Sequence, residues 1–166
     1  MNLVYAIIIY PILFILPAYV ANGAPVLFGG GAPVDLNGKF RGKRIFGSHK
    51  TIKGLVAGIA SGILMGFVES LFPGLGFMLA VGIAQSLGTH AGDLVGSFSK
   101  RQAGIKEGGH NIADPYVFVL FALAFSLPLG NFPSYYGILF ILILTGIMHR
   151  LTNVIAHELK VKDVPW

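Results

Sequence analysis

The chain has 166 residues, of which 54% are hydrophobic and only 11% are charged, and its mean hydropathy is +0.74. Since an ordinary soluble domain carries about 25% charged residues, this composition excludes a water-soluble globular protein and indicates helices that cross a bilayer. The formal charge of +5 then fits anionic headgroups and phosphates rather than nucleic acid, and the lack of cysteine excludes disulfides, thiolate metal sites and cysteine nucleophiles.

The first apolar segment, residues 2–21, is long enough to cross the roughly 30 Å hydrocarbon core of a bilayer as a helix. No Lys or Arg precedes Lys39, so the positive region of a cleaved signal peptide is missing and we expect the segment to remain as the first span. Residues 22–53 are instead rich in Gly, Pro and basic side chains. They cannot span, and a loop this long is more often functional than idle.

The second apolar segment, residues 54–72, has a glycine at every fourth position, so these glycines share one face of a helix. They are Gly54, Gly58, Gly62 and Gly66. Small residues in this pattern let another helix approach closely, and we expect that helix to belong to the same chain rather than to another subunit. A Pro73-Gly74 turn then leads into a third span, residues 75–90, which forms a hairpin with the second.

The rest of the chain alternates polar and apolar segments in the same way. Residues 91–114 form a second polar loop, and residues 115–129 and 134–148 form a second hairpin of spans. Residues 149–166 are a polar tail, in which residues 151–159 are expected to form an interfacial helix. The sequence therefore predicts an all-α integral membrane bundle of about five transmembrane helices.

The basic residues orient this bundle. All 12 Lys and Arg residues fall in the two polar loops and the tail, which this order of spans places on one side of the membrane. Cytoplasmic segments carry such an excess of cations, so we expect the N-terminus outside and the C-terminus in the cytoplasm. Residues 1–166 are expected to form a single membrane-embedded domain, multi-pass in the cell (plasma) membrane, with its active site facing the cytoplasm.

The second loop contains a group of polar and charged residues whose spacing is characteristic. In order they are Gly92, Asp93, Ser97, Lys100, Arg101, Lys106 and Glu107. The set resembles the signature of the CTP:phosphatidate cytidylyltransferase family, in which Gly-Asp is followed by a Ser, by a Lys-Arg pair three residues on, and by a later Lys-Asp. The spacing is the same here, and only the last Asp is replaced, by Glu107.

The first loop carries a second group of glycines and cations, Gly38-Lys39, Gly42-Lys43-Arg44 and Lys50-Thr51. With these, its length and its expected spans, the whole chain is similar to the archaeal branch of that family, the CDP-archaeol synthases. The resemblance implies a Mg²⁺-dependent nucleotidyltransferase that moves a cytidylyl group from CTP onto 2,3-bis-O-geranylgeranylglycerol 1-phosphate. The products would be a CDP-activated ether lipid and pyrophosphate, as in archaeal phospholipid biosynthesis.

The resemblance also implies roles for residues of both loops. Asp93 is expected to bind Mg²⁺ that bridges the triphosphate, while Lys100 and Arg101 meet the lipid phosphate or the departing pyrophosphate. These three residues form the expected catalytic set. The expected CTP-binding residues are Asn22, Lys39, Arg41, Lys43, Arg44, Lys50, Thr51, Ser97 and Lys106.

The second metal ligand is less clearly marked. The bacterial and eukaryotic pattern continues with His-Gly-Gly and an Asp-Arg pair, whereas here Gly108-Gly109-His110 is followed by Asp114-Pro115 at shorter spacing. Asp114 is the first choice for that ligand and Glu107 is the reserve. The histidines have no zinc-site spacing, so no metal other than Mg²⁺ is expected.

From the residues alone, each role has a plainer alternative. Lys100 and Arg101 could be a generic cytoplasmic pair, Asp93 could cap a helix end, and the basic loop, which lacks a Walker motif, could simply bind lipid. A membrane lipid kinase, another CDP-lipid transferase and a small channel or transporter subunit stay open as functions. The lack of charges near the bilayer midplane disfavours transport, and association into a homo-oligomer stays open.

Overall fold

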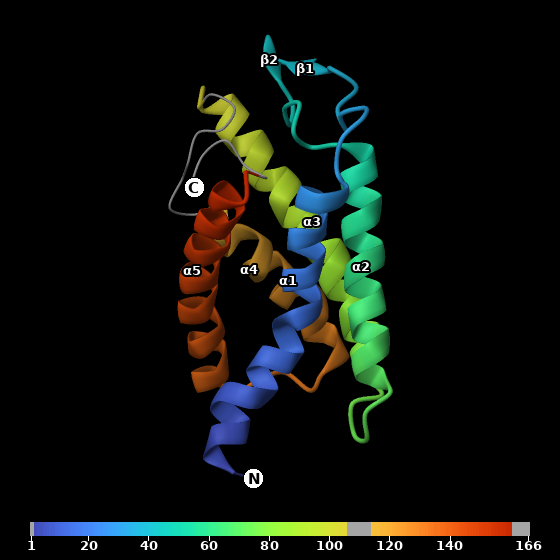
Figure 1. Ribbon diagram of the computed structural model, residues 1–166, viewed down its shortest axis with the longest axis vertical. Helices are drawn as coiled ribbons and strands as arrows, with labels where there is room; N and C mark the ends of the chain where they lie inside the picture. Colours follow the sequence, from blue (N-terminus) through green and yellow to red (C-terminus); the bar gives the residue numbers. More distant parts are fainter. Residues whose placement is uncertain (1, 106–113, 161–166) are drawn as a thin grey trace.

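The structure is a computed structural model that describes residues 2–105 and 114–160. Within those residues it is a bundle of five α-helices (Figure 1). In chain order the elements are the π-helical turn η1 (Tyr5–Ile9), α1 (Tyr10–Phe28), β1 (Lys39–Phe40), β2 (Lys43–Arg44), α2 (Ile52–Ser70), α3 (Met78–Gln102), α4 (Asp114–Ser126), the 3₁₀ turn η2 (Leu127–Leu129) and α5 (Tyr135–Glu158). The two short strands pair antiparallel in a hairpin.

In the part of the chain that the structure describes, three helices are long and apolar enough to cross a membrane, namely η1 with α1 (Tyr5–Phe28), α2 and α5. α3 has 25 residues and so a length of about 37 Å, but its last turns carry the charged signature residues. α4 with η2 (Asp114–Leu129) is apolar and shorter. Large apolar side chains such as Leu64 and Ile143 stay exposed, as lipid-facing side chains do. The chain is therefore an all-α membrane bundle, as its composition predicted.

Three helices continue past the ends that hydropathy predicted. α1 runs to Phe28, so Asn22 lies inside a helix and not at its end. α3 runs to Gln102, so the signature residues from Asp93 onward stand on a helix and not in a loop. α5 runs to Glu158 and contains most of the segment expected as a separate interfacial helix. In α3 and α5, hydropathy falls where charged residues begin, whereas Lys, Arg and Gln continue a helix in water as well as many apolar residues do. This reason does not apply to α1, whose added residues are Asn22 to Phe28.

The glycine face of α2 packs against α1 and α3 of the same chain, as predicted. A Cβ atom at Gly58 would lie 2.6 Å from the Ala21 carbonyl oxygen of α1 and 2.2 Å from Nε2 of His90 on α3. One at Gly66 would lie 2.7 Å from the Cα of Gly82 on α3. These spacings leave no room for a side chain, so the helix backbones approach closely and fix α3 against its two neighbours.

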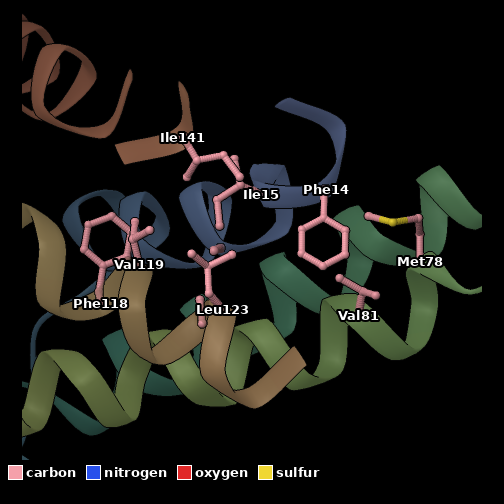
Figure 2. Packing of buried hydrophobic residues seen from close by; sticks show 10 residues of the cluster. Phe14, Ile15, Met78, Val81, Phe118, Val119, Leu123 and Ile141 are labelled. Carbon is pink, nitrogen blue, oxygen red and sulfur yellow. The ribbon is translucent and has the colours of Figure 1, made fainter. Parts of the chain in front are cut away.

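The buried apolar side chains gather where α1, α3, α4 and α5 meet (Figure 2). The cluster consists of Phe14, Ile15, Ala18, Met78, Val81, Phe118, Val119, Ala122, Leu123 and Ile141. Within the same layer, Nε2 of Gln85 on α3 donates a hydrogen bond of 2.8 Å to the Phe14 carbonyl oxygen of α1. α3 contacts α1, α2 and α4, so the whole bundle holds its charged end in place.

The two hydrophilic segments meet at one end of the bundle, at the top of Figure 1, where the β1–β2 hairpin lies beside the last turns of α3. Nζ of Lys43 donates to the Gln102 carbonyl oxygen at 2.6 Å. The rings of Phe40 and Phe98 also pack there, with their centroids 5.8 Å apart. The sequence predicted that the basic segments share one side of the bundle, and this shared end contains the candidate site.

Candidate active site

Backbone hydrogen bonds join the two ends of the first loop at the start of α2. The Val34 N–H donates to the Lys50 carbonyl oxygen at 2.7 Å, and the Ile52 N–H donates to the Ala32 carbonyl oxygen at 3.0 Å. This short antiparallel pairing closes the loop at its base. Lys50 therefore occupies a fixed place directly before α2.

Thr51 caps α2. Its hydroxyl oxygen accepts hydrogen bonds from the N–H groups of Gly54 and Gly30, both at 3.1 Å, and so satisfies one of the free donors at the helix start. The structure thus gives Thr51 a place in the helical frame, as it does Asn22 within α1. Their expected contacts with CTP stay predictions.

Asp35 holds the interior of the loop. Its buried carboxylate accepts from Nη2 of Arg44 at 2.7 Å and from Nε of Arg44 at 3.2 Å, and backbone N–H groups also donate to it. The Arg44 guanidinium, helped by these N–H groups, holds the pKa of the Asp35 carboxyl well below its usual range. Arg44, expected to bind CTP, is thus engaged by a carboxylate of its own loop.

The hairpin between β1 and β2 turns at Arg41 and Gly42, whose φ angles are +51° and +78°. Two such left-handed residues make the tight turn that matches the twist of paired strands. The turn leaves Lys39 and Arg41 exposed, with the Arg41 guanidinium 5.4 Å from the centre of the Phe40 ring. Both cations therefore face solvent, where an anionic ligand can reach them.

Lys50 and Asp93 form the central ion pair of the site. Nζ of Lys50 lies 2.6 Å from each carboxylate oxygen of Asp93, and the two side chains are 31% and 33% exposed. The first loop supplies the lysine, whereas α3 supplies the carboxylate. The pair thus joins the two segments that the sequence marked separately, and solvent reaches both charges.

A small pocket opens beside this pair. It is lined by Pro25, Val34, His49, Lys50, Thr51, Gly54, Leu55, His90, Asp93 and Leu94. His90 is buried one helical turn before Asp93, with its ring against the backbone of Gly58. α1, the first loop, α2 and α3 all contribute to the pocket. Its lining combines apolar side chains with the charged pair of Lys50 and Asp93.

A second ion pair joins α3 to α4. Nζ of Lys100 lies 2.9 Å from a carboxylate oxygen of Asp114, the first residue of α4. Ser97 is buried one turn earlier on α3, while Arg101 is half-buried beside Lys100. Lys106, Glu107 and His110 lie outside the described residues. The predicted catalytic residues Asp93, Lys100 and Arg101 therefore occupy the last three turns of one helix.

The carboxylates suit a magnesium ion that is shared with a substrate. Mg²⁺ prefers oxygen ligands and is commonly held by one or two carboxylates together with phosphates. Among residues 2–105 and 114–160, no three His, Asp or Glu side chains come together to hold a metal. Asp93 and Asp114 each pair with the ammonium group of a lysine in the structure. Either carboxylate could instead bind a metal ion whose other ligands are phosphate oxygens. The two carboxylates belong to separate ion pairs. Lys100, the partner of Asp114, lies about 10 Å from Asp93 along the axis of α3.

Two residues of this end were not singled out from the sequence. Asp35 organises the first loop, and Gln102 accepts from Lys43 and donates from Nε2 to the Arg44 carbonyl oxygen at 3.5 Å. Asp35 had a visible signal, because it is the only acid among the cations of residues 22–53. Gln102 had none, since its contacts depend on how the hairpin lies against α3.

Comparison with known proteins places the chain in a family. Residues 4–166 match the model of the CarS-like family, described as CDP-archaeol synthase. The chain is 44% identical to the CDP-archaeol synthase of Pyrococcus abyssi over 92% of its own length and 95% of the relative's. It is 38% identical to the CDP-archaeol synthase of Methanococcus aeolicus over the full length of both chains.

A solved structure shows the same fold. It is described as an intramembrane enzyme for archaeal membrane lipids biosynthesis, and it matches with a TM-score of 0.83 and 36% identity. The match covers 89% of this chain and 94% of that one. By its nearly complete sequence match and its helical bundle, the chain belongs to the CDP-archaeol synthase family.

Proposed function

We propose that this chain transfers the cytidylyl group of CTP to 2,3-bis-O-geranylgeranylglycerol 1-phosphate, forming the CDP-activated archaeal ether lipid and pyrophosphate. The observation that carries the proposal is the site itself, in which Lys50–Asp93 and Lys100–Asp114 stand together with a basic loop at one end of a membrane bundle. A lipid phosphate can reach that end while its tails stay in the bilayer, and CTP can reach it from water. The family match supports this reading and gives no support to the lipid kinase or channel alternatives.

Charge neutralisation is the main task in this reaction. An oxygen of the lipid phosphate attacks the α-phosphorus of CTP, the bond from that phosphorus to the bridging oxygen breaks, and pyrophosphate leaves with the electron pair. The attacking phosphate is already an anion, so no general base is required. What the transition state needs is positive charge in fixed positions, because preorganised cations stabilise developing charge without reorganising.

The cations of both segments can supply that charge. Lys50 lies in the central pair, Lys43 is tied to the end of α3, and Lys100 and Arg101 lie on α3 itself. We assign Lys43, Lys50 and the exposed Lys39 and Arg41 to the triphosphate, and Lys100 and Arg101 to the lipid phosphate or the departing pyrophosphate. This division follows their origin, since the first group belongs to the first loop and the second to α3.

Asp93 would hold Mg²⁺, with Asp114 as second ligand and Glu107 in reserve. When bound, the ion would neutralise phosphate charge and orient the triphosphate. In the structure the ammonium of Lys50 faces both oxygens of Asp93 at 2.6 Å, so the carboxylate keeps its charge satisfied without a metal.

We place the active site on the cytoplasmic side of the cell membrane. All 12 Lys and Arg residues fall within residues 39–53, 100–106 and 150–162, and cytoplasmic segments of membrane proteins carry such an excess. Five crossings from this arrangement put the N-terminus outside. CTP is then available to the site from the cytoplasm.

Product formation tests the function directly. The protein, purified and reconstituted in nanodiscs, is supplied with radiolabelled CTP, Mg²⁺ and the ether-lipid phosphate, and we expect a labelled lipid together with equimolar pyrophosphate. ATP in place of CTP is the matched control and should give neither product. Transfer of the γ-phosphate of ATP to the lipid, with no pyrophosphate from CTP, would show a kinase and refute the proposal.

A further inference from the structure

Asp35 takes no part in the proposed chemistry, yet five hydrogen bonds converge on its carboxylate. Two come from the Arg44 side chain and three from the backbone N–H groups of Asn37, Phe46 and Gly47, the last three at 3.0 to 3.1 Å. The side chain is fully buried. Charge-assisted hydrogen bonds of this kind are about twice as strong as neutral ones, so they fix the loop around one point.

The contacts of Asp35 continue to the backbone of Lys50. The Gly47 N–H donates to Asp35 at 3.1 Å, and the Gly47 carbonyl oxygen accepts from the Lys50 N–H at 3.4 Å. The Lys50 carbonyl oxygen in turn accepts from Val34, the residue before Asp35, at 2.7 Å. These links form a closed ring. Lys50 is therefore held on both its N–H and its carbonyl side while its ammonium reaches Asp93.

A second branch runs from Asp35 to the hairpin. Arg44, whose guanidinium pairs with Asp35, offers its carbonyl oxygen to Nε2 of Gln102, and its neighbour Lys43 donates to the Gln102 carbonyl oxygen. The Asp35 carboxylate thus helps to position both Lys43 and Lys50, which contact α3 at Gln102 and at Asp93. Without it, the six cations of residues 22–53 would repel one another with no acid among them.

We propose that Asp35 is a positioning residue for nucleotide binding: it holds the first loop in the one conformation that presents Lys43 and Lys50 to α3. This inference rests on the proposed function for its ligand, CTP. It also reassigns Arg44, which serves the loop through Asp35 rather than the triphosphate. Among the described residues, the apolar core of the bundle contains none from this loop, so a substitution at Asp35 leaves that core unchanged.

Kinetics with Asp35→Asn give the first test. The amide has the same shape, but its NH₂ group faces donors, so the loop loses its centre and we expect KM for CTP to rise at least tenfold. KM for the lipid phosphate should stay within twofold, because Lys100 and Arg101 lie on α3. Arg44→Lys, which keeps one charged donor, should lie between the parent and Asp35→Asn. Glu158→Gln, an exposed acid at the end of α5, is the matched control and should match the parent.

A purely structural role would give a different pattern. If Asp35 only helped the chain to fold, Asp35→Asn would lower the active fraction and hence kcat, with both KM values unchanged. That result, or a variant indistinguishable from the parent, overturns the proposal.

Cross-linking tests the position of the loop without any activity. The chain has no cysteine, so Phe40→Cys with Phe98→Cys introduces one thiol pair across the hairpin and α3, where the two rings now pack. A short bismaleimide should join this pair readily in the otherwise unchanged chain and at least fivefold more slowly when Asp35→Asn is added. Equal rates would show that Asp35 does not place the loop. A parent that makes no CDP-lipid but shows the rate difference would refute the proposed function and leave the positioning role standing.

Discussion

The bundle and the first loop are held together in opposite ways. α1, α2 and α3 meet through glycines, with Gly66 and Gly82 backbone to backbone, and through an apolar cluster spread over four helices. Within the described residues, none of the buried apolar side chains belongs to residues 29–50 of the first loop, whose interior is instead held by one carboxylate, that of Asp35. The bundle therefore distributes its stability over many contacts, whereas the loop concentrates its order in a few charged ones.

Because of this difference, we expect different residues to determine the stability of the protein and its activity. A lipid-embedded frame can be rigid without any charge, because its backbone hydrogen bonds are internal and its close helix contacts are apolar. The charged groups proposed to meet a triphosphate stand at one end, where Lys50 and Asp93 are partly exposed to solvent. Changes at that end should then alter activity and leave unfolding nearly unchanged, while changes between the helices should do the reverse.

The largest effect is expected from Asp93→Asn. Loss of the carboxylate removes the expected metal ligand and leaves Lys50 without its partner, so kcat/KM should fall about 1,000-fold, or about 4 kcal/mol of transition-state stabilisation. Helical content and thermal unfolding in detergent should match the parent. An enzyme within threefold of the parent would remove Asp93 from the site.

The reverse behaviour is expected from Gly66→Ala. A Cβ at this position would lie 2.6 Å from the Met78 carbonyl oxygen and 2.7 Å from the Cα of Gly82, and backbone cannot move aside as a flexible side chain can. Overpacking of this kind costs about 1–3 kcal/mol, measured as a lower unfolding midpoint in detergent. kcat at a temperature where the variant is folded should stay near that of the parent. The same substitution at Gly23, where a Cβ meets nothing within 4 Å, is the control.

A smaller loss of activity is expected from Lys100→Ala. The variant removes one cation and leaves Asp114 without its lysine, so turnover should fall tenfold or more, about 1.4 kcal/mol at the least. Arg150→Ala, an exposed cation on α5, tests whether any positive charge at this end would serve. Equal losses in the two variants would reduce Lys100 to a generic cytoplasmic charge.

The smallest effect is expected from a substitution at Thr51, where the first loop joins the bundle. Thr51→Ala removes the cap of α2 together with the acceptor of the Gly30 N–H, at a cost of about 1 kcal/mol in stability. Because Thr51 also follows Lys50, KM for CTP should rise by a few-fold at the same time. Paired thermal unfolding and kinetic measurements would show whether the loop and the bundle are coupled here, and a loss of stability with KM for CTP unchanged would show that they are not.

Much of the bundle could be predicted from the sequence because its signals are periodic. The glycines from Gly54 to Gly66 repeat every fourth residue, and a helix with that pattern needs a close neighbour whatever the rest of the chain does. α3 and α5 extend beyond the spans predicted from hydropathy for a physical reason. Hydropathy falls where Asp93 or Arg150 appears, but a charged residue does not end a helix, and both lie within one.

For the candidate site, the sequence indicated which residues to consider but not which of them contact one another. The signature marked Asp93, Lys100 and Arg101, and the structure places them on one helix end. That Lys50 pairs with Asp93 across 43 positions depends on how the first loop closes, and that loop has no period from which a conformation could be read. Asp35 was passed over for the same reason, since its partners lie up to 12 positions away within an irregular segment.

Equilibrium binding of radiolabelled CTP to the nanodisc-reconstituted protein tests the central claim most directly, because it measures whether this charged end holds a nucleotide at all. We expect saturable binding that excess CTP displaces far better than ATP does, and that Lys50→Met weakens at least tenfold with no change in thermal unfolding. Binding of equal strength in Lys50→Met, or no CTP binding by the parent protein, would contradict it.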